Sequence, residues 1–213
     1  MTREDYESAE HYAREALARN PGNPFVIDIL LNCLIERRKE DYVDLLEDEE
    51  IIESLAQLEI ADRRERTDFS DLRRAHYYSA LRNFSEAINW ADSAVRKNPG
   101  QVRAWAARAE IKLRIKSDPK ALHSVDSDIK QIQKLADDTK GVRTHAGLLA
   151  KLRIRFELAK GNLPAAVKLY ESAPLGHGQM RLKLAREIAL EAVERNERDV
   201  DVMAFANRVL ASR

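Results

Sequence analysis

The sequence predicts an all-α protein with no sheet, made of about ten helices that pair side by side in antiparallel fashion. Only 7 of the 213 residues are glycine and 6 are proline, which leaves long stretches without helix breakers. Apolar residues recur three and four positions apart, and no alternating β-branched run is flanked by hairpin turns. One helix-sized pattern also recurs along the chain, which is typical of a repeat architecture.

The clearest copy of this pattern is the segment 84–100. Ala87, Ala91 and Ala94 share one helical face. Their small side chains allow a neighbouring helix to come close. The triplet Asn98-Pro99-Gly100 then ends the helix, because the proline disfavours helical backbone at the residue before it. We therefore expect these three alanines to form a buried seam, called the alanine seam below.

The same pattern occurs 78 residues earlier, in the segment 6–22. The coinciding pairs are Tyr6 and Phe84, Ala9 and Ala87, Tyr12 and Trp90, Ala13 and Ala91, Ala16 and Ala94, Leu17 and Val95, and Asn20-Pro21-Gly22 and Asn98-Pro99-Gly100. A third copy contains Leu163, Ala166, Tyr170 and Ala173. Agreement at aromatic, small and helix-stop positions together is more specific than a shared apolar period.

These residues resemble the tetratricopeptide repeat (TPR) family, whose unit is a helix–turn–helix of about 34 residues. Phe84, Ala87, Ala94 and Pro99 match the aromatic, small and proline positions of the family's second helix, and Trp105 matches the first-helix tryptophan of the next unit. The resemblance implies a right-handed α-solenoid of antiparallel helix pairs, forming a single repeat domain over 1–213 with one concave face. Because 78 exceeds two ideal units, the segment 40–68 is expected to be irregular.

Caps, breakers and apolar spacing predict the individual helices. They are expected at about 4–19, 24–38, 40–61 with a break near 47–50, 69–82, 84–98, 102–115, 119–136, 142–160, 163–172, 179–195 and 199–211. The acidic run 47–50 suits a helix N-terminus, where the helix dipole favours negative charge. A charged linker or a frayed helical turn is expected at 61–68, with Asp68 or Ser70 capping the next helix. The segment 178–213 matches the repeat poorly and is expected to be a degenerate helix pair.

Charge and composition favour a cytoplasmic protein that binds neither membrane nor nucleic acid. Lys and Arg number 36, as do Asp and Glu, so bulk charge gives no attraction to nucleic acid. No apolar stretch approaches a membrane span. The single cysteine, Cys33, cannot form an internal disulfide. The densest basic cluster is interpreted as ion pairs within helices, with a phosphate-binding patch as the alternative; it contains Arg63, Arg64, Arg66, Arg73 and Arg74.

The sequence predicts no catalytic site, metal site or cofactor site. None of the five histidines pairs with another histidine or with the cysteine at metal-ligand spacing; they are His11, His76, His123, His145 and His177. The segment Gly176-His177-Gly178 is too short for a phosphate-cradling loop and has no P-loop lysine nearby. The aromatic residues Tyr12, Tyr78, Trp90 and Trp105 are interpreted as packing residues, with a stacking platform for a ligand as the alternative. We therefore expect a non-enzymatic chain.

The TPR resemblance implies a protein-binding scaffold that holds a peptide or helix of a partner in its concave groove. First-helix residues that do not pack internally would line the groove, and on this register they are Asp28, Asn32, Arg73, His76, Arg103, Glu110, Lys151 and Arg155. Their mixed charges suggest a ligand that carries both charges. The carboxylate clamp that some family members use is disfavoured, because Asp28 and Leu72 occupy its lysine positions.

The segment 6–22 aligns with the second helix of a unit, so the helix expected to cover Ala9, Ala13 and Ala16 is missing from this sequence. Either the N-terminal helix packs only on the next unit, or a partner or a second copy covers the face, or an upstream domain of a longer protein does so. The alternative function is accordingly a regulatory or sensing segment of a larger multidomain enzyme, whose catalytic domain lies outside this chain. An RNA-binding helical repeat is a third alternative.

Overall fold

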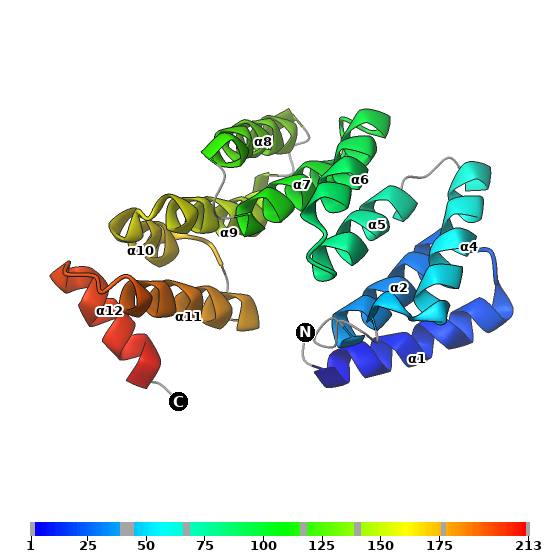
Figure 1. The fold of residues 1–213 in the computed structure, drawn as a ribbon, viewed down its shortest axis with the longest axis horizontal. Coiled ribbons are helices and arrows are strands. Elements are labelled where there is room, and N and C mark those ends of the chain that lie inside the picture. Colours follow the sequence, from blue (N-terminus) through cyan, green and yellow to red (C-terminus); the bar gives the residue numbers. More distant parts are fainter. Residues whose placement is uncertain are drawn as a thin grey trace. The chain divides into compact units, whose positions relative to one another are not determined.

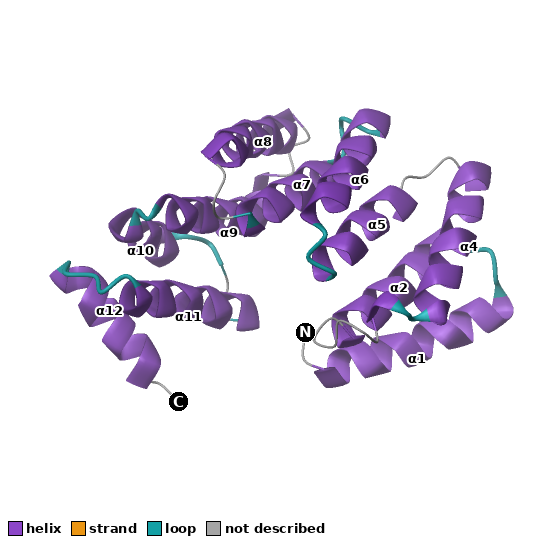
Figure 2. Ribbon diagram, viewed as in Figure 1, coloured by secondary structure: helices purple, strands orange, loops and turns teal. Residues whose placement is uncertain are grey.

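The computed structural model of the protein describes residues 3–38, 45–65, 69–115, 119–138, 142–175 and 178–211. All regular structure in these ranges is α-helix, with no strand among them (Figures 1 and 2). The helices are α1 (Arg3–Arg19), α2 (Pro24–Arg38), α4 (Glu49–Glu65), α5 (Phe69–Ala80), α6 (Phe84–Lys97), α7 (Val102–Arg114), α8 (Pro119–Asp138), α9 (Val142–Lys160), α10 (Leu163–Ser172), α11 (Gln179–Glu194) and α12 (Val200–Ala211). The prediction of an all-α fold is confirmed for these residues.

The largest departure from the predicted helix boundaries is at α4. It starts at the predicted break, where Asp48 caps it by accepting a hydrogen bond from the Ile51 amide, and it continues to Glu65. The prediction of a linker starting at residue 61 was wrong, because the charges there support the helix: Arg63 bonds to Glu59 one turn earlier, at 2.5 Å. The predicted short helix before the break and the capping residue Asp68 lie largely or wholly outside the described residues.

The chain divides into two compact units, Met1–Ala107 and Arg108–Arg213, with the division inside α7. In the first unit α1 packs on α2, α2 packs on α4 and α5, and α5 packs on α4 and α6. In the second unit α9 packs on α8, α10 and α11, while α12 packs on α10 and α11. Contacts between neighbouring helices occur in a single helical repeat domain as well as in two separate domains, so they do not distinguish the two. One repeat domain over 1–213 therefore stays a prediction.

Each unit contains its own apolar core. In the first unit Leu31 and Leu34 of α2 and Leu58 of α4 are all 0% exposed, and they belong to one cluster with residues of α1 and α5. In the second unit Leu163, Leu184 and Ile188 are the corresponding fully buried residues. The aromatic rings of Tyr170 and Phe205 pack edge to face in this core, 5.3 Å apart. Burial of these side chains is the main favourable contribution to each unit's stability.

Three helix pairs are joined by the same kind of turn. α5 and α6, α9 and α10, and α11 and α12 are each connected through one left-handed residue: Arg82 with φ 55°, Gly161 with φ 78° and Asn196 with φ 53°. The next amide donates to the carbonyl five residues earlier, as Asn83 does to Tyr78 at 2.9 Å. Asn83 and Asn162 then cap the following helix with their side chains. Such short connections make the paired helices antiparallel.

The alanine seam of α6 is buried as predicted. Ala87, Ala91 and Ala94 are all 0% exposed. An alanine seam also occurs on α11, where Ala185, Ala189 and Ala192 are at most 3% exposed. The α11–α12 pair therefore has a buried alanine seam, here on the first helix of the pair, and the same turn as the other two pairs. A degenerate repeat pair over 178–213 stays a prediction.

Candidate functional site

At least six of the eight predicted groove residues bond to other residues of this chain. They are Asp28, Asn32, Arg73, Glu110, Lys151 and Arg155. The premise that these side chains do not pack internally is therefore wrong for these six. A partner-binding role for the groove residues stays a prediction.

In the first unit three of the predicted groove residues, Asp28, Asn32 and Arg73, connect α2 to α5. The Arg73 Nε donates to Asp28 Oδ1 at 2.9 Å, and its Nη1 donates to Asn32 Oδ1 at 2.6 Å. The Arg73 side chain is 10% exposed and that of Asp28 is 13% exposed. Burial raises the pKa of the Asp28 carboxyl, an effect that the charges of Arg73 and Arg103 only partly offset. Arg73 thus holds two helices together and is not presented to solvent.

In the second unit the predicted groove residues connect α9 to its neighbours. The Lys151 Nζ lies 2.6 Å from Glu110 Oε1 on α7. The Arg155 guanidinium binds Glu187 of α11 through Nε at 2.9 Å and Nη2 at 2.6 Å. Burial opposes the charge of Arg155, but its hydrogen bonds to Glu187 outweigh this effect and raise the pKa. Glu187 was not among the predicted residues, because its segment matched the repeat poorly.

His76 on α5 and Arg103 on α7 differ from the other six because both are exposed. The positive charge of Arg103 partly offsets the rise that burial causes in the pKa of the Asp28 carboxyl. Within the predicted set, these two side chains are therefore the most exposed to solvent in the first unit.

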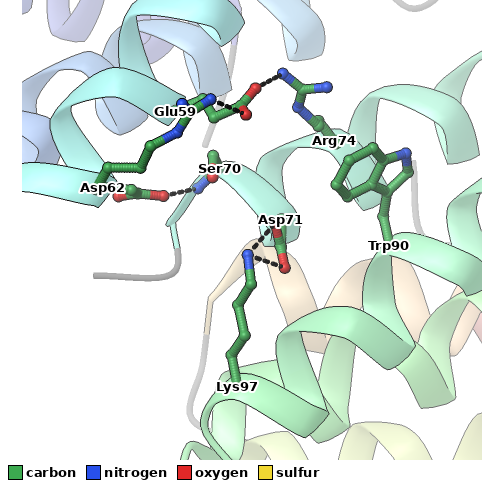
Figure 3. A pocket seen from close by; sticks show the side chains of 8 residues that line it. Glu59, Asp62, Ser70, Asp71, Arg74, Trp90 and Lys97 are labelled. Carbon is green, nitrogen blue, oxygen red and sulfur yellow. Dashed lines mark hydrogen bonds and ion pairs between the residues drawn. The ribbon is translucent and has the colours of Figure 1, made fainter. Parts of the chain in front are cut away.

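A pocket of about 190 Å³ lies between α4, α5 and α6 in the same unit (Figure 3). It is lined by Glu59, Asp62, Arg63, Ser70, Asp71, Arg74, Trp90 and Lys97. Helix ends supply several of these groups. Asp62, near the end of α4, accepts a hydrogen bond from the Ser70 amide at 2.6 Å and so caps α5. Asp71 lies in the first turn of α5, where the helix dipole favours a carboxylate.

The charges in the α4–α6 pocket compensate each other. Lys97 Nζ lies 2.8 Å and 2.9 Å from the two oxygens of Asp71, which is 2% exposed. The Lys97 ammonium donates its hydrogen bond to Asp71 Oδ1. Asp71 Oδ2 lies near the same positive charge but accepts no well-aligned hydrogen bond. Arg74 donates to Glu59 at 2.6 Å and lies over the Trp90 ring, 4.8 Å from its centroid. The pocket is therefore polar and close to neutral, with one aromatic wall.

The basic cluster that the sequence singled out meets this pocket through Arg63 and Arg74. Both donate to Glu59. The Arg63–Glu59 pair lies within α4, as the interpretation expected, whereas the Arg74–Glu59 pair joins α5 to α4 and so is not a pair within one helix. The pocket itself was not predicted. Its lining combines residues up to about 40 positions apart in the sequence, and each of them also has an ordinary role as a cap or a helix-surface charge.

A second hollow, in the other unit, lies between α8 and α9. Its lining consists of Leu122, His123, Asp126, Phe156 and Lys160. The Lys160 ammonium lies 5.1 Å from the centroid of the Phe156 ring. This hollow is wider and more open than the α4–α6 pocket and contains fewer charged groups.

Comparison with protein-family models and with curated proteins finds no match to this chain. The TPR resemblance is therefore carried by residues of this chain alone. Among the described residues, no group of three or more His, Cys, Asp or Glu side chains is placed to hold a metal ion. None of the described helices is both long enough and apolar enough to cross a bilayer.

Proposed function

We propose that this chain is a non-enzymatic, cytoplasmic scaffold, whose helix pairs stack as a right-handed TPR-type solenoid and bind a peptide or helix of a partner protein. The observation that carries the proposal is the repeated hairpin. Three helix pairs share one turn geometry, and α6 and α11 bury alanine seams. Stacked helix pairs of this kind form an extended concave surface that can bind a ligand.

The bonded groove residues support this function by ordering the first helices before a partner arrives. Arg73 joins α2 to α5, and Lys151 and Arg155 join α9 to α7 and α11. Side chains that are already held lose less conformational entropy when a ligand binds. The groove of this proposal is therefore a preorganised polar surface, with exposed His76 and Arg103 as direct contacts in the first unit.

The mixed charge of this surface suits a ligand that carries both charges. Acidic groups of the ligand would bind near Arg103, and its basic groups would bind near Glu110 or Glu187. Each internal ion pair also leaves some carboxylate surface open, since the Glu110 side chain is 34% exposed and that of Glu187 is 31% exposed. Partly exposed charges of this kind contribute to specificity and association rate more than to affinity.

Affinity capture with the intact chain, followed by peptide mapping of the retained protein, tests the proposed function. The variants Arg103→Glu and His76→Glu should keep the helical content and weaken binding of the mapped peptide by roughly tenfold. Lys134→Glu is the matched control, because Lys134 is exposed on α8, a second helix on this register. Equal binding by all three variants and the wild type would contradict the groove assignment.

A further inference from the structure

One side of α1 presents an aromatic residue between two opposite charges. Tyr12 is 68% exposed, and Asp5 and Arg19 are also exposed. Ala9 and Ala16 lie between them and are only half-buried. These five residues are alternately four and three positions apart, so they follow one line along the helix. They are called the α1 face below. The neighbouring side of α1 packs on α2 through buried Ala13 and through Leu17, which is why Ala9 and Ala16 at its border are half-buried.

The corresponding face of α6 is covered by another helix. Ala87, Trp90 and Ala94 are the residues of α6 that match Ala9, Tyr12 and Ala16. Both alanines of α6 are 0% exposed, and Arg74 of α5 lies over the Trp90 ring. This residue pattern therefore serves as a helix-docking face where the structure shows it occupied. On α1 the same pattern is still partly accessible.

The order of residues on the α1 face makes it complementary to itself. An acid, an alanine, a tyrosine, an alanine and a base follow one another, so the face is nearly symmetric about Tyr12 except for its charge. In an antiparallel pair of such faces, Asp5 of each helix meets Arg19 of the other and Ala9 meets Ala16. A two-fold interface has this property, because each residue and its partner make the same contact twice.

We propose that two copies of this chain associate through their α1 helices, packed antiparallel and centred on Tyr12. The alanines allow the helix axes to approach to about 8–10 Å. The two Tyr12 rings meet at the two-fold axis, where aromatic contact adds to apolar burial. The proposal does not depend on partner binding in the groove, because it uses α1 alone.

The expected association is weak and salt-sensitive. A helix of 17 residues is about 26 Å long, so one helix pair buries less area than the roughly 1,200–2,000 Å² of a stable complex. The two charge contacts lie at the exposed ends of the face and are screened by salt. We therefore expect a dissociation constant in the micromolar range that rises with ionic strength.

Sedimentation equilibrium over a wide concentration range measures this association with the full chain. The average mass of the wild type should rise with concentration toward that of a dimer. Tyr12→Ala should weaken association by roughly tenfold or more. Ala9→Arg should abolish it, whereas Ala18→Arg, the same change at an exposed position on the other side of α1, should leave it unchanged. Circular dichroism checks that each variant keeps its helix.

A charge exchange separates this interface from any other mode of association. Asp5→Arg and Arg19→Asp should each weaken self-association, because each places like charges opposite one another twice. Mixing the two variants should restore dimers, since the arginine introduced at position 5 would then face the aspartate introduced at position 19, and the native Arg19 would face the native Asp5. A wild type that stays monomeric at the highest concentration overturns the proposal. Association that survives Tyr12→Ala and both charge reversals, or a mixture no tighter than its components, overturns it as well.

Discussion

α1 and α6 carry the same residue pattern 78 positions apart, yet the structure buries them to different extents. The alanine seam of α6 is 0% exposed throughout, whereas on α1 Ala13 is 4% exposed and Ala9 and Ala16 are half-buried. Trp90 is covered by Arg74, but Tyr12 is 68% exposed. The pattern thus specifies a face that can accept a helix, and the neighbouring elements determine whether that face is filled.

Ala87→Arg is expected to have the largest effect. The guanidinium would be forced into the closed contact between α6 and its neighbours, so the free energy of unfolding should fall by about 4 kcal/mol. Ala9→Arg, the matched change on α1, should cost less than about 1 kcal/mol, because the side chain can reach solvent. Chemical denaturation measures both losses. Losses of equal size would show that α1 is enclosed as tightly as α6.

Replacing the aromatic residue by alanine should give the second-largest difference in stability loss between α6 and α1. Trp90→Ala removes a half-buried ring and the surface on which Arg74 lies, and we expect a loss of about 2 kcal/mol. Tyr12→Ala should change the stability of the dilute monomer by no more than about 0.5 kcal/mol. The comparison uses thermal melts at low concentration. A destabilising Tyr12→Ala would mean that this ring packs within its own unit.

Lowering the pH should destabilise the packing of α1 before that of α6. Glu10 bonds to Arg14 at 2.8 Å and to Arg37, and Arg14 bonds to Glu50 at 2.6 Å. Burial alone would raise the pKa of Glu10, but its hydrogen bonds to Arg14 and Arg37 outweigh burial and lower it. The hydrogen bond to Arg14 is the main effect that lowers the pKa of Glu50.

Because both folded-state pKa values lie below the ordinary value of 4.5, the stabilisation is present above that pH and is lost as the pH falls through the folded values. The loss should stay under about 1 kcal/mol, since Glu50 is partly exposed and screened. Hydrogen exchange, corrected for the intrinsic rate, should show α1 losing protection on acidification while α6 keeps it. An equal loss of exchange protection in both helices would contradict the expectation that acid-sensitive ion pairs stabilise α1 more than α6.

The turn that leads into α6 should give the smallest effect. Arg82 has φ 55°, a conformation that costs a residue with a side chain about 1 kcal/mol and costs glycine little. Arg82→Gly should therefore stabilise the first unit by up to about 1 kcal/mol. Gly161 is the natural control at the matching turn, since its φ of 78° is a backbone conformation that alanine adopts only with strain. Gly161→Ala should destabilise, and the same sign for both variants would contradict the shared turn geometry.

Local sequence signals were enough to predict most helices and two of the turns. Asn98-Pro99-Gly100 stops α6, Pro24 starts α2, and Gly161-Asn162 joins α9 to α10, because these effects depend on backbone preferences within a few residues. The burial of Ala87, Ala91 and Ala94 also followed from spacing, since one helical face was uniformly small. The alanine seam on α11 had the same spacing, but it lacked the aromatic and helix-stop residues that drew attention to the other copies.

The residue contacts of the candidate site depended on the tertiary structure. Arg73 and Asp28 are 45 positions apart and Arg155 and Glu187 are 32 apart, so no local pattern distinguished these bonded charges from solvated ones. The α4–α6 pocket needed Asp62, Asp71 and Lys97 to meet from three helix ends. Periodicity tells which face of a helix is apolar. Which charges meet across that face is a matter of how the helices pack, because ion pairing acts between side chains that are close in space and far apart in the chain.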